Sequence, residues 1–221
     1  MPAPPAWHRH AARWVRPAAW VAVAVPLALL LLAFQTGSIG AEPIEEVTHR
    51  TGFWALTLLV ATLAVTPVRA VTGWNWLAPV RRTLGLGAFG YACLHLSTYL
   101  FDQWFSWAYI VEDVTERPYV TVGFTAFLLL VPLAVTSTKG WIRRLGKRWQ
   151  KLHRLVYIAA GLAVLHFVWL VKADLRTPLV FAAVLAALLG WRVAAALRGR
   201  QRKAARATRP PRRETRLRTD P

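Results

Sequence analysis

Two kinds of side chain are scarce in this sequence, and each scarcity excludes a class of protein. Cys93 is the only cysteine among 221 residues, which excludes an intramolecular disulfide framework and any iron–sulfur or zinc site built on four cysteines. Aspartate and glutamate together number 10, against 28 lysines and arginines, so the net charge is +18. No polar stretch is long enough to fold as a soluble domain, and we therefore expect apolar segments to make up the folded part of the protein.

Hydrophobic residues are abundant and tryptophan is unusually frequent. They make up 56% of the chain, which holds twelve tryptophans. Apolar content this high beside such strong basicity is typical of a membrane protein whose positive charge is confined to one side.

Six apolar runs of about 17 to 20 residues can each cross the roughly 30 Å hydrocarbon layer as a helix. They occupy residues 18–34, 52–68, 84–101, 118–136, 152–171 and 178–197. The basic start before the first run also fits a signal peptide. We favour a retained helix, because the run is long and no clear small-residue cleavage site follows it. The sequence thus predicts an all-α membrane protein, a bundle of six transmembrane helices.

Charge predicts how this bundle is oriented. The connections 35–51, 102–117 and 172–177 hold eight of the ten acidic residues and only four basic ones. By the positive-inside rule, both termini are then cytoplasmic. We divide the chain into a basic cytoplasmic tail (1–16), the helical domain (17–197) and a basic, disordered cytoplasmic tail (198–221). For the second tail we prefer contact with anionic membrane lipid to nucleic-acid binding.

Two histidines lie at matching depth in different runs. His95 and His166 each stand about six residues before the end of a run that leads into an acidic connection. Buried imidazoles are costly in a membrane unless they are hydrogen-bonded or ligated. Two at one depth on facing helices suit the two axial positions of a b-type haem in the bundle core. The alternative for each is a hydrogen-bonded core residue.

A third histidine, His153, has no histidine at its own depth. It precedes His166 by thirteen residues, which is roughly 20 Å along an ideal helix and leaves the two side chains about 140° apart. The two therefore serve different cofactors or lie on a bent helix. Arg81 and Arg82 are the best-placed partners, able to pair with a haem propionate, a flavin phosphate or a lipid phosphate. Simple anchoring at the cytoplasmic surface explains both arginines equally well.

Residues 85–90 match a glycine-rich nucleotide motif through Gly85, Gly87 and Gly90. The context excludes a dinucleotide site, because no strand precedes the motif and the segment is membrane-embedded. Small residues here let neighbouring helices, or a flat porphyrin, approach closely instead.

Several long motifs resemble one membrane protein family. They are RRTLGLGAFGYACLHLSTYL (81–100), RPYVTVG (117–123), TSTKGWIRRLGKRWQKLHRLVYIAA (136–160) and LHFVWLVK (165–172). Together they are similar to the MsrQ (YedZ) family, within the ferric-reductase-like transmembrane group. The resemblance covers roughly residues 50–195.

The resemblance implies a function. Proteins of this family are haem-binding membrane subunits of the bacterial MsrPQ system, which repairs oxidised proteins by reducing methionine sulfoxide. It implies haem b, one or two per chain, held by His95, His153 and His166, and it implies FMN. It also implies electron supply from the quinone pool or a cytoplasmic flavin reductase, and a periplasmic molybdenum-containing catalytic subunit of the MsrP type as acceptor. The chain would then be an electron-transfer subunit in the bacterial inner membrane rather than the substrate-reducing enzyme.

The wider group usually places two histidines on each of two helices. Here the run 84–101 carries one, and Arg81 or Arg82 stands where the other would be, which leaves a second haem open. Two alternatives also remain: a stand-alone ferric reductase, and a non-redox membrane transporter or assembly factor. Residues 198–221 are too few for the flavin and nicotinamide domain that a stand-alone reductase needs, and a non-redox protein would be colourless.

Overall fold

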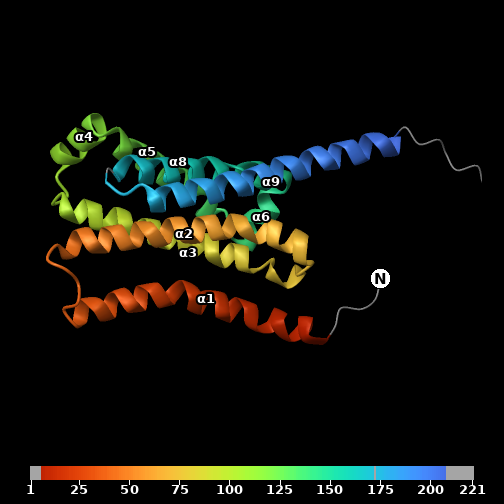
Figure 1. The fold of residues 1–221 in the computed structure, drawn as a ribbon, viewed down its shortest axis with the longest axis horizontal. Helices are drawn as coiled ribbons and strands as arrows, with labels where there is room; N and C mark the ends of the chain where they lie inside the picture. The colour runs from red at the N-terminus through yellow and green to blue at the C-terminus, as the bar shows by residue number, and fades with distance from the viewer. Residues whose placement is uncertain (1–5, 172, 208–221) are drawn as a thin grey trace, which may run out of the picture.

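A computed structural model describes residues 6–171 and 173–207, and every regular element in them is helical (Figure 1). The elements are α1 (Ala6–Gln35), α2 (Pro43–Thr72), the 3₁₀ helix η1 (Asn75–Leu77), α3 (Val80–Asp102), α4 (Trp107–Glu116), α5 (Pro118–Val135), α6 (Lys139–Leu145), α7 (Lys147–Leu152), α8 (Leu155–Leu170) and α9 (Arg176–Ala207).

Six helical segments among the described residues are long and apolar enough to cross a membrane. They are Arg13–Gln35, Pro43–Thr72, Asn75–Asp102, Pro118–Val135, Lys147–Leu170 and Arg176–Gln201. Each overlaps one of the six predicted runs, which confirms the predicted all-α fold with six spans. The helices continue through Pro26, Pro67 and Pro132.

The helices extend beyond the apolar runs at both chain ends. Helix α1 begins at Ala6 and α9 continues to Ala207, so parts of both expected tails are helical. Alanine and arginine, which dominate these extensions, have high helix propensity and let a helix continue into water. Residues 1–5 and 208–221 of the expected tails lie outside the described part of the chain.

Helix α2 lies at the centre of the bundle. In its most apolar window 44% of residues are buried, against 22% or less in the other five spans. The most extensive packing joins α2 to α3 and α5 to α8, and α1 and α9 lie against the outside (Figure 1). Side chains of the main core cluster come from α1, α2, α3, α8 and α9: Val23, Leu56, Leu58, Leu59, Val60, Leu63, Ala88, Tyr91, Ala160, Val164 and Leu185.

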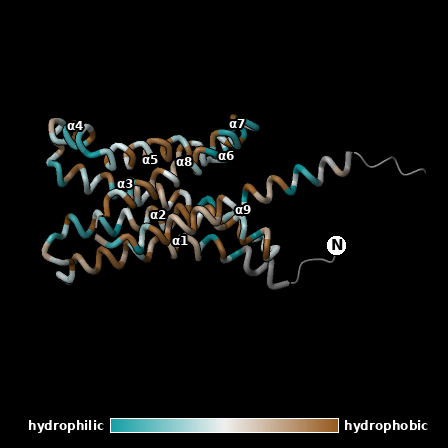
Figure 2. The backbone as a smooth tube through the Cα atoms, turned by 45° about the horizontal axis from the view of Figure 1, so that its top comes forward, coloured by the Kyte–Doolittle hydropathy of each residue, from teal (hydrophilic) through white to brown (hydrophobic). Residues whose placement is uncertain are grey.

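Large apolar side chains also cover the outside of the bundle. Exposed examples include Phe34 on α1, Leu128 on α5 and Val180 on α9. Figure 2 shows hydrophobic residues along the middle of the helices and hydrophilic ones gathered at α4 and at α6 and α7. An apolar exterior of this extent suits contact with lipid rather than water.

The two ends of the bundle differ in charge. The acidic end is formed by the connections 36–42 and 103–117 with residues 171 and 173–175, and it includes α4. The basic end is formed by the connections 73–79 and 136–146, with the start of α1 and the end of α9. Figure 1 places α4 at one end of the bundle, and α6 and both described chain ends at the other.

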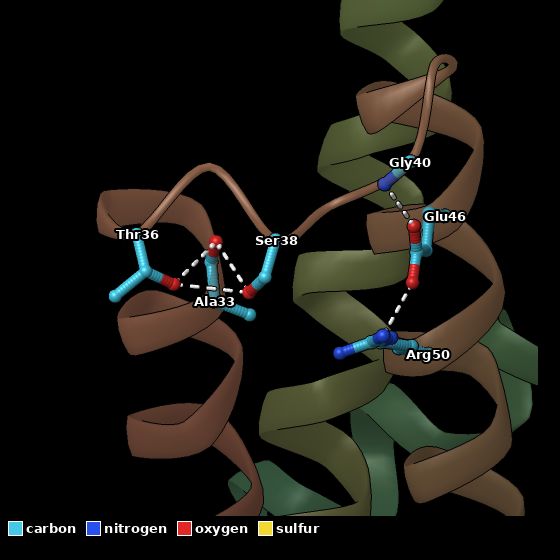
Figure 3. Close-up of polar contacts among 6 residues, drawn as sticks. All are labelled: Ala33, Thr36, Ser38, Gly40, Glu46 and Arg50. Carbon is cyan, nitrogen blue, oxygen red and sulfur yellow. Dashed lines mark hydrogen bonds and ion pairs between the residues drawn. The ribbon is translucent and has the colours of Figure 1, made fainter.

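The connection from α1 to α2 is built from short polar contacts at the acidic end (Figure 3). Ser38 donates its hydroxyl to the Ala33 carbonyl at 3.2 Å, which satisfies one of the free carbonyls at the end of α1. Glu46, in the first turn of α2, accepts the Gly40 backbone N–H at 2.8 Å and pairs with Arg50. Its carboxylate also lies favourably at the positive end of the α2 dipole.

The connection 102–117, expected only as a loop, contains α4, whose Asp113 is 7% exposed. Asp113 accepts a hydrogen bond from the Tyr99 hydroxyl at 3.0 Å and pairs with Arg117 at 3.3 Å. A side-chain hydrogen bond with Tyr119, together with the Asp113 carboxylate, raises the pKa of Arg117. These contacts tie α4 to the end of α3 and to the start of α5.

Candidate functional site

Two imidazole rings face each other near the acidic end. His95 on α3 and His166 on α8 have ring centroids 6.2 Å apart and ring planes at 75°. Both side chains are partly buried. The structure thus brings together the two histidines whose matching depth the sequence indicated.

Each ring is held by a backbone carbonyl on a neighbouring helix. His95 Nδ1 lies 2.9 Å from the Thr48 carbonyl oxygen on α2, and His166 Nδ1 lies 2.7 Å from the Tyr119 carbonyl oxygen on α5. A carbonyl can only accept, so Nδ1 carries the proton and Nε2 keeps its lone pair. This second-shell arrangement is usual for histidines that bind a metal through Nε2.

A glycine lies one helical turn after each carbonyl and makes room for the ring. A methyl group added at Gly52 would lie 2.9 Å from His95 Nδ1, and one added at Gly123 would lie 2.7 Å from His166 Nδ1. Both distances are well inside normal contact between nonbonded heavy atoms. Only glycine lets each imidazole pack this closely against the neighbouring helix.

The two half-sites repeat at a fixed offset along the chain. Each histidine follows its carbonyl partner by 47 residues. Carbonyl, glycine and histidine each recur 71 residues later (48 to 119, 52 to 123 and 95 to 166). The pair α2 and α3 and the pair α5 and α8 therefore present their histidines in the same way.

The separation of the rings leaves room for one metal ion. Two imidazoles on opposite sides of one metal place their centroids about 6.2 Å apart, because each metal–nitrogen bond is about 2.0 Å and each nitrogen lies about 1.1 Å from its centroid. No group of three or more histidine, cysteine, aspartate or glutamate side chains is placed to hold a metal within residues 6–171 and 173–207. A pair of imidazoles could also hold a metal whose other ligands a bound macrocycle supplies.

His153 is separate from this pair. It lies between α7 and α8, where the helical span is interrupted, and its ring stacks on Trp149 at 3.9 Å between centroids. The thirteen-residue spacing to His166 predicted either different cofactors for the two histidines or a bent helix, and the helix is interrupted at residues 153 and 154. Its Nδ1 lies 3.2 Å from the Trp149 carbonyl oxygen, while Nε2 is buried with no hydrogen-bond partner within the described structure. His153 Nε2 thus makes no regular hydrogen bond, although the Leu133 backbone lies close enough to interact with the ring.

The two arginines predicted near His153 lie at the start of α3, and both are exposed. Arg81 donates to the Thr66 hydroxyl at 3.0 Å and interacts electrostatically with His153. Arg82 is the residue that the 71-residue offset pairs with His153 (82 to 153). At this position of the repeat, the half-site of α5 and α8 has His153, whereas the half-site of α2 and α3 has Arg82.

Comparison with known proteins identifies the relatives of the chain. Residues 51–164 match the family described as "Ferric reductase like transmembrane component". The chain is 53% identical over 197 residues to the "Protein-methionine-sulfoxide reductase heme-binding subunit MsrQ" of Xanthomonas campestris pv. campestris (strain 8004), covering 86% of this chain and 90% of the relative. It is 50% identical over 178 residues to the protein of the same name from Herminiimonas arsenicoxydans, covering 79% and 82%. This chain belongs to the MsrQ family. No solved structure matches it.

Membership of the MsrQ family confirms the resemblance that the sequence motifs indicated. The matched segment includes Gly52, His95, Gly123 and His153 and ends two residues before His166. The alignment to the Xanthomonas protein covers most of the chain, so the likeness is not confined to one motif.

Sequence reasoning missed the two glycines and the carbonyl acceptors of this MsrQ family member. Their signal was the equal spacing of Gly52 and Gly123 from the two histidines, which becomes informative only once the histidines are paired. Sequence reasoning also passed over Arg192, although an arginine within an apolar run is itself a functional signal.

Proposed function

We propose that this chain is a membrane b-type cytochrome whose haem binds between His95 and His166. The observation that carries the proposal is the facing imidazole pair, 6.2 Å apart, with both Nδ1 atoms engaged by carbonyl oxygens. Two imidazoles suit the two axial positions of a haem iron. The names of the relatives, which describe haem-binding subunits, support the same assignment.

When bound, the haem supplies one-electron redox chemistry. The protein holds it in place. The Thr48 and Tyr119 carbonyls fix the proton on each Nδ1, make each Nε2 a better electron donor and prevent the rings from turning. The buried apolar residues of the main core cluster, such as Leu56 and Val164, keep water out of the bundle.

His153, Arg81 and Arg82 form a second cofactor site in this proposal, for a second haem b or for FMN. The buried Nε2 of His153, which makes no regular hydrogen bond, supports a ligand role, and the two arginines are suited to a propionate or phosphate group. Arg82 is the residue that corresponds to His153 at the 71-residue offset, so a haem bound here would lack a second histidine.

We further propose that electrons pass from the basic end to the acidic end, across the bacterial inner membrane. The concentration of lysine and arginine at one end supports a cytoplasmic location for that end and for both termini. The donor is quinol or a cytoplasmic flavin reductase. The acceptor is a periplasmic, molybdenum-containing methionine-sulfoxide reductase of the MsrP type, which docks at the acidic end beside α4. The name shared by the relatives supports such a system.

The test is a dithionite-reduced minus oxidised spectrum of the purified protein, with haem and flavin quantified per chain. We expect b-type bands in the wild type, and loss of the haem held by the pair in His95→Ala and in His166→Ala. The exposed His49, which lies 4.0 Å from Glu45, provides the control: His49→Ala should keep the wild-type spectrum.

Full haem retention in both His95→Ala and His166→Ala would reject this ligand assignment. A colourless wild-type protein, produced with ample haem supply, would instead favour a non-redox membrane protein.

A further inference from the structure

Arginines from three helices converge at the basic end. Arg69 lies near the end of α2, Arg81 at the start of α3 and Arg192 within α9. Arg81 interacts electrostatically with both of the others. The convergence brings three permanent positive charges toward one region of a membrane-spanning bundle.

Arg192 reaches from α9 into the bundle. It donates to the Tyr157 hydroxyl at 2.8 Å and to the Leu63 carbonyl at 2.9 Å, with its guanidinium 5.0 Å from the centre of the Tyr157 ring. The contacts with Leu63 on α2 and Tyr157 on α8 hold the guanidinium between those two helices.

No carboxylate in the described residues balances this charge. Every aspartate and glutamate that the structure describes lies at the acidic end or in the helix turns beside it. Arg81 is exposed, whereas Arg69 and Arg192 are partly buried, and buried charges in proteins are normally paired.

Side-chain atoms that are buried without a hydrogen-bond partner lie in residues at the same end of the bundle. Within the described structure, the buried side-chain nitrogens and oxygens that lack a hydrogen bond are Arg69 Nε, Trp76 Nε1, His153 Nε2 and Arg192 Nε. All belong to residues at the basic end, and three of them are obligate donors. The other guanidinium nitrogens of these arginines are bonded within the chain: Arg69 Nη2 donates to Asn75 Oδ1 at 3.0 Å, and both Nη atoms of Arg192 donate as described above. Because buried donors are nearly always satisfied in native proteins, the two Nε–H groups and the Trp76 N–H are the donors left to bind a group from outside the chain.

We propose that Arg69, Arg192 and Trp76, with Arg81 at the rim, form a binding site for the oxyanion group of a small molecule held in the bundle. Guanidinium groups bind phosphate and carboxylate oxygens with paired, charge-assisted hydrogen bonds, and an indole N–H adds a further donor. The oxyanion is the phosphate of FMN, the headgroup phosphate of a phospholipid or a propionate of haem. The flavin and haem sources rest on the proposed function, whereas the lipid source does not.

Occupancy of this site is tested by removing the guanidinium groups one at a time and together. The variants are Arg69→Gln, Arg192→Gln and the double variant, with Arg192→Lys to retain the charge. Arg148→Gln is the matched control, because Arg148 is an exposed arginine of α7 at the same end. Flavin and haem are measured per chain, and bound phospholipid is measured by native mass spectrometry in the same detergent.

We expect one of the three molecules to fall about tenfold in occupancy in each Gln variant, to recover partly in Arg192→Lys and to be unchanged in Arg148→Gln. If flavin falls, titration of the wild type should give tighter binding of FMN than of riboflavin, and the double variant should bind the two equally. A fall in phospholipid alone assigns the headgroup, and a fall in haem alone assigns a propionate.

The proposal is overturned if the double variant keeps flavin, haem and phospholipid at wild-type levels. Thermal stability of each variant, compared with Arg148→Gln, separates loss of a ligand from loss of the fold. Absence of haem and flavin from the wild type would reject the proposed function, while the phospholipid measurement would still decide the oxyanion site.

Discussion

At the scale of single residues, the candidate site depends on glycine as much as on histidine. Gly52 and Gly123 allow each imidazole to approach the backbone closely enough for Nδ1 to reach a carbonyl oxygen. Histidine supplies the ligand nitrogen, and glycine with the carbonyl one turn earlier sets its direction. A side chain of any size at either glycine would force the ring away.

We therefore predict that Gly52→Ala and Gly123→Ala each weaken haem binding by 10 to 100-fold, the usual effect of disturbing a second-shell partner of a metal ligand. Haem content per chain and the electron paramagnetic resonance spectrum of the oxidised haem provide the measurement. Gly90→Ala is the control, because a methyl group at Gly90 meets nothing within 4 Å. Equal haem content and unchanged spectra in all three variants would show that the glycines do not position the rings.

At the scale of elements, close packing attaches α1 to α3. Gly87 on α3 faces Val23 on α1, and a methyl group at Gly87 would lie 2.7 Å from a Val23 side-chain carbon. Tyr91, one turn later, donates its hydroxyl to the Val23 carbonyl at 2.8 Å. Of the three glycines in residues 85–90, Gly87 is the one that allows α1 to approach α3, whereas a methyl group at Gly90 would meet nothing within 4 Å.

Gly87→Ala should destabilise the attachment of α1 by about 1 to 3 kcal/mol, the usual cost of overpacking a close contact. Thermal unfolding in detergent provides the measurement. Val23→Ala in the same chain should recover part of the loss, because it removes the carbons that the new methyl group meets. Equal stability of Gly87→Ala and the wild type would contradict the close contact between α1 and α3.

A second element, α4, connects the acidic end to the candidate site. Arg117 pairs with Asp113 of α4 and also contacts Tyr119, whose carbonyl accepts a hydrogen bond from His166 Nδ1. A protein that docks against α4 would therefore bind within a few residues of Tyr119, whose carbonyl orients the His166 ring.

At the scale of the whole molecule, charge separates the two ends of the bundle. The acidic end carries α4 and the connection from α1 to α2, while the basic end carries α6, α7 and the oxyanion site proposed above. A chain inserted with its basic end in the cytoplasm would present α4 to the periplasm.

Cysteine labelling tests this orientation. In a Cys93→Ser background, Ser38→Cys at the acidic end should react with a membrane-impermeant maleimide in intact spheroplasts. Lys139→Cys at the basic end should react only after lysis, because the proposed orientation places the lysine- and arginine-rich end in the cytoplasm. The reverse pattern would invert the proposed direction of electron transfer.

The sequence predicted the fold well, because membrane spans obey a local rule. Backbone groups in lipid must be satisfied within a helix, so length and hydrophobicity are enough to indicate the six spans. Helix ends were predicted less well. Helix α4 and the extensions to Ala6 and Ala207 lie outside the long apolar runs, and only runs of that length indicated a helix in the sequence.

What the sequence determined by itself was the set of spans, the charge asymmetry, the family and the depth at which His95 and His166 lie. The tertiary structure decided which groups meet: the Thr48 and Tyr119 carbonyls with the two rings, Gly52 and Gly123 beneath them, and Arg192 with Leu63 and Tyr157. The physical reason is that depth follows from position along a single helix. Contact between helices depends on their rotation and packing, which many side chains far apart in the sequence set together.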